Sequence, residues 1–170
     1  ISPTAHVLRA SILVIGPKEG LKTISSSFVM VTDSNFGANG TLIFTDAAVI
    51  PNPTALQLAD IAISAVEKAK VTAGIKEPKV AFLSYSTKGS ADGESVRKVR
   101  EAIEILKMRD VDFEFDGELQ LDAAIVPEVA ASKAPNSKVA GHANVLIFPD
   151  LNAGNIGYKL TQRLAKAKAL

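Results

Sequence analysis

The 170 residues suffice for one sizeable domain, and 47% hydrophobic with 22% charged residues is the composition of an ordinary globular chain. A formal net charge of +1 and the lack of any apolar run near ~20 residues argue against nucleic acid and membrane as partners. The absence of cysteine excludes disulfides, thiolate metal sites and a cysteine nucleophile, and it agrees with the cytoplasmic location that we expect.

The first part of the chain predicts a helix, a β-hairpin and a longer helix. A helical pattern begins near residue 4 and ends at a Gly-Pro break. Residues 23–31 and 41–44 are β-like on either side of a polar turn, which predicts a hairpin. Thr54 follows a Pro-Asn-Pro breaker and is a typical N-cap. The helix after it carries an apolar stripe made of Leu58, Ile61, Ala62, Ala65, Val66 and Ala69.

Strands and helices alternate in the rest of the chain. Strands are predicted at residues 79–84, 111–115 and 144–148, and helices at 94–109, within 121–132 and after 149. The first and last of these strands are apolar on both faces, which indicates a mostly parallel sheet covered on both sides. The sequence therefore predicts an α/β fold of the three-layer α/β/α sandwich type.

The helix at residues 94–109 illustrates the amphipathic pattern. Its inward side is expected to be Val96, Val99, Ile103 and Leu106. Its exposed side is expected to carry the i,i+4 ion pairs Arg97–Glu101 and Arg100–Glu104, each worth a few tenths of a kcal/mol. The final helical run reaches residue 167 without a Gly or Pro stop signal, and residue 1 is not Met. Both ends look cut, so a piece of a longer protein is expected.

Three polar segments follow the last three predicted strands, at residues 84–93, 116–120 and 149–155. Ligands of open α/β sheets bind beyond the carboxyl ends of the strands, and parallel connections place these three segments on one edge. In the first, hydroxyl groups, Lys88 and Gly89 fit an anion site, but a polar connection with capping serines explains them better. In the third, two glycines three residues apart fit a phosphate loop, or an Asn155 N-cap with glycines that allow close packing.

A metal site is not predicted. Asp116, Glu118 and Asp122 could serve a metal or acid–base chemistry, but solvated loop charges and acids at a helix N-terminus explain them better. His6 and His142 are isolated, so zinc has little support.

Several long motifs resemble one family. They are TAHVLR at residues 4–9, LSYSTKGSA at 83–91, DGELQLDAA at 116–124, VAASKAP at 129–135 and FPDLNAGNIGYK at 148–159. On these motifs the chain resembles the phosphate acetyl/butyryltransferase family, the phosphotransacetylases, from end to end.

The resemblance implies acetyl transfer between acetyl phosphate and coenzyme A, which are both substrates, with no cofactor. It implies a fold similar to the isocitrate/isopropylmalate dehydrogenase-like fold and usually a homodimer. Residues 1–20 would end the first cleft domain, and residues 21–170 would form the second α/β domain with cleft loops and a dimer surface. Alanines 59, 62, 65 and 69 fit such self-association, although they serve an internal core equally well.

The same resemblance implies the site residues. Arg9 falls on a family active-site arginine, expected to bind anionic substrate and to stabilise developing charge as a catalytic residue. The residues expected to line the substrate cleft are Ser86, Thr87, Lys88, Asn155 and Gly157. Lys133 and Lys159 match family cations, expected either to bind substrate or to be surface charges.

The family also carries a C-terminal Ser-Arg-Gly segment with a base aspartate, which this sequence lacks. The fragment alone is therefore expected to be inactive, although the resemblance implies that the intact protein is an enzyme. Two alternatives remain: a phosphate butyryltransferase, and a non-catalytic regulatory and oligomerisation domain like that of some malic enzymes.

Overall fold

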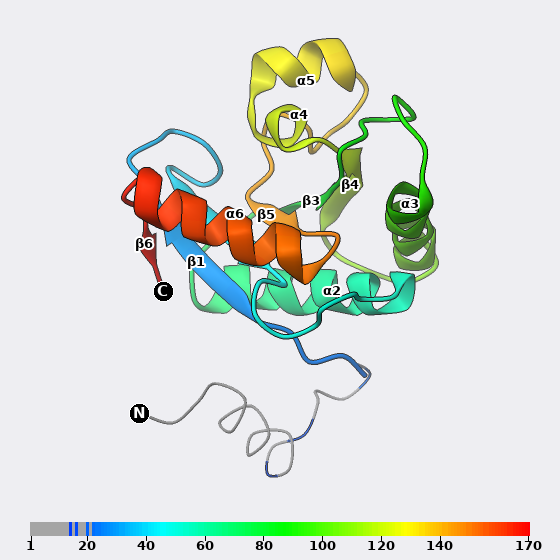
Figure 1. The fold of residues 1–170 in the computed structure, drawn as a ribbon. Coiled ribbons are helices and arrows are strands. Elements are labelled where there is room, and N and C mark those ends of the chain that lie inside the picture. Colours follow the sequence, from blue (N-terminus) through cyan, green and yellow to red (C-terminus); the bar gives the residue numbers. More distant parts are fainter. Residues whose placement is uncertain (1–13, 15, 17–19, 21) are drawn as a thin grey trace.

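The computed structural model describes residues 14, 16, 20 and 22–170, so the expected first helix and Arg9 lie outside the described residues. Within this part of the chain, six strands form one sheet in the order β4-β3-β5-β2-β1-β6 (Figure 1). The strands are β1 (Ser27–Val31), β2 (Thr41–Thr45), β3 (Lys79–Leu83), β4 (Glu114–Leu119), β5 (Val145–Ile147) and β6 (Lys168–Ala169).

Helices cover both faces of this sheet, which confirms the predicted three-layer α/β/α sandwich. The helices are α2 (Ala55–Val71), α3 (Glu94–Lys107), α4 (Leu121–Ile125), α5 (Pro127–Lys133) and α6 (Leu151–Leu164). One apolar core joins α2 and α3 to the face that carries Ile43, Val80 and Val145. A second core joins the α4–α5 region and α6 to the opposite face, which carries Leu146 and Leu42. In the described part of the chain, no helix is long and apolar enough to span a bilayer.

The sheet is mixed but mostly parallel. Strands β2, β5, β3 and β4 run parallel to one another. Strand β1 is antiparallel to both β2 and β6, so the predicted hairpin of β1 and β2 is confirmed. From β3 the chain continues through α3 to the outer strand β4, whereas from β5 it continues through α6 to the opposite edge at β6. The winding direction therefore reverses between β3 and β5, and such a reversal is where open α/β sheets place their ligands.

Helix α2 forms where the sequence predicts it. The Thr54 Oγ1 accepts a hydrogen bond from the Gln57 amide at 3.2 Å, and the Gln57 side chain accepts one from the Thr54 amide at 2.9 Å. This capping box satisfies two amides at the start of the helix. The predicted stripe is buried throughout. The α2 alanines lie in the core that α2 and α3 form with the sheet, so they do not provide a self-association surface.

Two sequence predictions about the elements are wrong. Residues 116–119 belong to strand β4 and not to a loop, and β4 tolerates their polar side chains because it is an edge strand. The helix expected over part of residues 121–132 is present, but as two short helices, since Pro127 begins α5 and cannot continue α4. Helix α6 ends at Leu164, and the last residues pair with β1 as strand β6 instead of extending the helix.

Candidate functional site

Two of the three predicted segments, residues 84–93 and 149–155, follow parallel strands, whereas most of the third, residues 116–119, is strand β4 itself. Strands β3, β4 and β5 are parallel, so their carboxyl ends lie at one edge of the sheet. After β3 comes an irregular loop, residues 84–93, which we call the β3–α3 loop. After β5 the chain enters α6 almost at once, because Asp150 is its N-cap and accepts a hydrogen bond from the Ala153 amide at 2.9 Å. The interpretation of Asn155 as an N-cap is therefore wrong.

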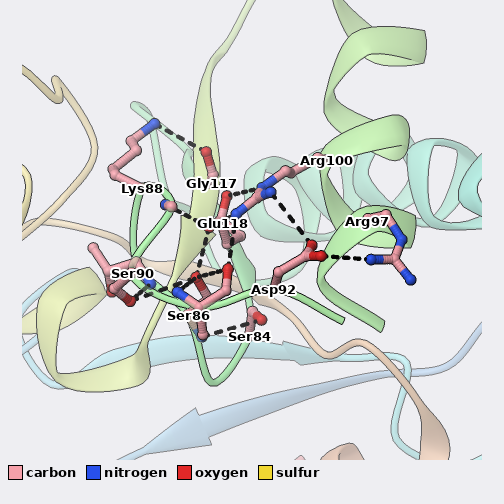
Figure 2. A network of polar contacts seen from close by, with 12 residues as sticks. Ser84, Ser86, Lys88, Ser90, Asp92, Arg97, Arg100, Gly117 and Glu118 are labelled. Atoms are coloured by element: carbon pink, nitrogen blue, oxygen red, sulfur yellow. Dashed lines mark hydrogen bonds and ion pairs between the residues drawn. The ribbon is translucent and has the colours of Figure 1, made fainter. Parts of the chain in front are cut away.

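A buried carboxylate organises the β3–α3 loop (Figure 2). Glu118, on β4, is 3% exposed. Its Oε1 accepts hydrogen bonds from the Ser86 hydroxyl at 2.8 Å and from the Gly89 amide at 2.8 Å. Its backbone carbonyl accepts another from the Lys88 amide at 3.1 Å. One residue of the edge strand thus holds three residues of the loop.

Arg100, on α3, provides the counter-charge. Its Nε donates to Glu118 Oε2 at 3.0 Å and its Nη2 to Oε1 at 2.9 Å, which is the bidentate geometry of strong arginine–carboxylate pairs. Burial raises the pKa of Glu118, but the hydrogen bonds from Arg100, Gly89 and Ser86 outweigh it and bring the pKa down to about 2. The same bonds to Glu118 raise the pKa of Arg100. The pair is therefore ionised throughout the neutral range.

A second set of contacts joins the loop to α5. The Thr87 hydroxyl accepts a hydrogen bond from the Gln120 amide at 2.9 Å and donates to Gln120 Oε1 at 3.3 Å. That same oxygen accepts a hydrogen bond from Lys133 Nζ at 3.0 Å. Lys133 also binds Asp122 at 2.9 Å, which lowers the pKa of that carboxyl. Ser86 and Thr87 are both buried, so their hydroxyls bond within the protein rather than facing a cleft.

Lys88 is the exposed cation of the loop. Its backbone is left-handed, with φ of 48°. Its Nζ forms an ion pair with Asp116 and donates to the Gly117 carbonyl at 2.9 Å. Lys88 and Lys133 line one cleft of about 450 Å³, together with Asp116 and residues 134–137. Two lysines therefore line the same cleft, and each is paired with a carboxylate.

The predicted residues on α6 form a separate group. Asn155 Nδ2 donates to the Ala47 carbonyl at 3.1 Å. Gly157 lies against Phe148, where an added Cβ would be 3.1 Å from the ring. The Nζ of Lys159 lies 5.8 Å from the centre of the Tyr158 ring. Among the described residues, no hydrogen bond or ion pair joins this group to the β3–α3 loop.

Another cleft, of about 590 Å³, is lined by the starts of α2 and α3 and by Asp150. Lys98, on α3, donates to Asn52 Oδ1 at 2.7 Å and to the Pro149 carbonyl at 2.9 Å. Burial lowers the pKa of Lys98, although Asp150 and Glu94 act in the opposite direction. Lys98 therefore ties together the connections that follow β2, β3 and β5, at the place where the winding direction reverses.

Several of these residues were missed or misjudged from the sequence. Glu118 is not a solvated loop charge, because β4 carries it beneath the loop. Arg100 binds Glu118 instead of Glu104, and Arg97 binds Asp92 at 2.6 Å instead of Glu101. No sequence pattern pointed to the burial of Glu118, because the polar residues 116–120 are typical of a loop.

The acids of this region face cations and not one another. Asp116, Glu118 and Asp122 pair with Lys88, Arg100 and Lys133 respectively. In the part of the chain that the structure describes, no group of three His, Asp or Glu side chains is arranged to hold a metal ion.

Comparisons with known proteins agree on one family. The family described as Phosphate acetyl/butaryl transferase matches residues 1–170. The chain is 56% identical to a phosphate acetyltransferase of Clostridium acetobutylicum over 171 residues, covering 100% of this chain and 51% of the relative. It is 56% identical to one of Treponema pallidum over 170 residues, covering 98% of this chain and 50% of that relative.

Solved structures agree. A phosphotransacetylase from Streptococcus pyogenes superposes with a TM-score of 0.91 at 46% identity, covering 99% of this chain and 50% of that one. A branched-chain phosphotransacylase from Enterococcus faecalis V583 gives 0.79 at 27% identity, covering 99% and 59%. The fold and the polar edge define an α/β domain of the phosphotransacylase type. The chain belongs to the phosphate acetyl/butaryl transferase family, and it spans about half the length of the curated relatives it matches.

Proposed function

We propose that the protein containing this chain is an acyltransferase that moves an acetyl group between acetyl phosphate and coenzyme A. The observation that carries the proposal is the 56% identity to a phosphate acetyltransferase along the whole chain. The relatives named above favour this reaction over butyryl transfer and over a malic-enzyme domain, because the most similar of them are phosphate acetyltransferases.

The chemistry sets what the site must supply. The coenzyme A sulfur attacks the acetyl carbonyl, a carbon–sulfur bond forms, and the carbon–oxygen bond to phosphate breaks. A base must take the thiol proton, since a thiol with a pKa near 8.5 is mostly protonated at neutral pH. Donors or cations must stabilise the negative charge on the carbonyl oxygen and on the departing phosphate.

We assign the anion-binding part of this task to the cleft beside Lys88 and Lys133. Phosphate oxygens would replace Asp116 and Asp122 as partners of the two ammonium groups, which are both partly exposed. Asn155, Gly157 and Lys159 would bound the substrate on the α6 side. Ser86 and Thr87 would act from inside the loop, by fixing its shape. Arg9 would add a guanidinium suited to phosphate from outside the described residues.

We further propose that residues 1–20 end a preceding domain, that residues 21–170 form the second domain, and that the protein is a cytoplasmic homodimer. The family resemblance supports these assignments, and the sheet of residues 27–169 agrees with one folded unit. Sedimentation of the whole protein at tens of micromolar tests the dimer, and a monomer alone would contradict it.

Thioester formation from acetyl phosphate and coenzyme A, followed by ultraviolet absorbance on the whole protein, tests the function. Lys88→Ala is expected to raise the KM for acetyl phosphate about tenfold or more, because a hydrogen bond to a charged group contributes ~1.5–3 kcal/mol. Lys70→Ala is the matched control, since Lys70 pairs with Asp112 at 3.0 Å away from the cleft. Absence of acetyl transfer by the wild type, or faster turnover of butyryl phosphate, would overturn the proposal.

A further inference from the structure

The β3–α3 loop is fastened to β4 through one residue, Glu118, by both its side chain and its backbone carbonyl. Of its residues, Ser86 and Gly89 donate to the Glu118 carboxylate, and Lys88 donates to the Glu118 carbonyl. Ser86 is 0% exposed, so water cannot replace the carboxylate as the acceptor for its hydroxyl. The loop adopts left-handed backbone at Lys88 and at Gly89, with φ of 48° and 90°. The Ser86 hydroxyl also lies 3.2 Å from the Ala91 carbonyl, but the carboxylate is its shortest acceptor and at the same time binds the Gly89 amide. The carboxylate therefore helps to hold the loop in this conformation.

The loop is also tied to α3 through the same carboxylate. Arg100 Nη2 donates to Glu118 Oε1 and, at 3.1 Å, to the Ala91 carbonyl. The amide of Ala91 in turn donates to the Ser86 hydroxyl at 3.0 Å. Figure 2 shows the resulting closed set of contacts, which runs from β4 to the loop, to α3 and back to β4. Ser86 and Gly89 from the loop and Arg100 from α3 donate to Oε1, and Arg100 also donates to Oε2. A neutral amide would place an NH2 donor against one of these donors.

We propose that Glu118 is a positioning residue, which fixes the β3–α3 loop through its negative charge so that Lys88 is held at the cleft. This inference rests on the proposed function, since it assigns the loop to the substrate. Glu118 does not touch the substrate itself, because it lies beneath the loop and its carboxylate oxygens are occupied by Ser86, Gly89 and Arg100.

The test compares Glu118→Gln with Asp60→Asn in the whole protein. Asp60 forms the other buried acid–arginine pair of the described residues, with Arg109 at 2.7 Å, and also binds Thr23 at 2.7 Å rather than the loop. Both changes remove a charge from a buried pair with little change of shape. Glu118→Gln is expected to raise the KM for acetyl phosphate about tenfold, with kcat changed less than about threefold. Asp60→Asn is expected to lower the melting temperature without changing KM.

Two further measurements separate positioning from stability. Glu118→Asp keeps the charge and is expected to recover part of the affinity, and exchange of the Gly89 amide is expected to quicken in Glu118→Gln alone. If Glu118→Gln does not fold, Arg100→Lys replaces it and is expected to raise KM in the same way. An active wild type with unchanged KM in these variants, or an equal rise in Asp60→Asn, would overturn the inference. A wild type without acetyl transfer would instead overturn the proposed function and the positioning role with it.

Discussion

Glu118→Gln should make the free energy of unfolding depend less on pH at acidic pH. The pKa of Glu118 falls from 4.5 to about 2 on folding. A carboxyl with a lowered pKa stabilises the folded state above its unfolded value, and this stabilisation disappears as the pH falls from about 4.5 towards 2. This fall of the pKa from 4.5 to about 2 corresponds to about 3 kcal/mol at neutral pH, because a tenfold change in a proton-binding constant is worth roughly 1.36 kcal/mol.

Glu118→Gln removes this pH-dependent contribution. The wild type is therefore expected to be more stable than the variant by about 3 kcal/mol above pH 6, and by only about 1.4 kcal/mol at pH 3. The assay is urea unfolding of both proteins at several pH values, with the free energy of unfolding extrapolated to water. Asp60, Asp112 and Asp122 also have lowered pKa values, but they are present in both proteins and cancel in the difference. If the free energies of unfolding of the two proteins differed by the same amount at every pH between 3 and 7, the reasoning would be refuted.

The remaining predictions concern stability at pH 7 and use the same unfolding assay. Gly154→Ala should destabilise by about 1–3 kcal/mol, because its Cβ would lie 2.2 Å from the Asp46 carbonyl oxygen of the backbone. Gly157→Ala is the control, with a 3.1 Å contact to a ring edge that can shift, and should change stability by less than about 1 kcal/mol. A larger loss of stability in Gly157→Ala than in Gly154→Ala would contradict the packing argument. Thr54→Ala should cost about 1 kcal/mol through loss of the capping box, and an unchanged stability would contradict that role.

The elements predicted correctly are those whose signal is local. Helix α2 has a cap, a helical stripe and no internal breaker, and β3 and β5 are short apolar runs between turn signals. The strand predicted at residues 111–115 lies at Glu114–Leu119 in the structure. The sequence misplaces it because Asp116, Gly117 and Glu118 are residue types typical of turns. Their place in the sheet comes from pairing with β3, which no pattern within residues 111–120 reveals.

Side-chain partners were less predictable than elements. On α3, Arg100 stands four residues before Glu104, and the spacing alone favours that pair. An exposed i,i+4 pair is worth only a few tenths of a kcal/mol, whereas an unpaired buried carboxylate costs several. Arg100 therefore binds Glu118, and Glu104 binds Lys107 at 2.8 Å. The deciding quantity is the burial of Glu118, which exists only once β3, β4 and the loop have come together.

The acid–base pairs at this edge divide into two kinds by exposure. The Lys88–Asp116 and Lys133–Asp122 pairs are partly open to solvent, and exposed pairs contribute only about 0–1 kcal/mol, so an arriving anion can exchange for the carboxylate at little cost. The Arg100–Glu118 pair has its carboxylate buried, and separating it would leave that charge without solvent or partner. The Arg100–Glu118 pair thus keeps the loop in place, whereas the two lysine pairs can change partner. The burial of the carboxylate decides which of these two roles a pair can have.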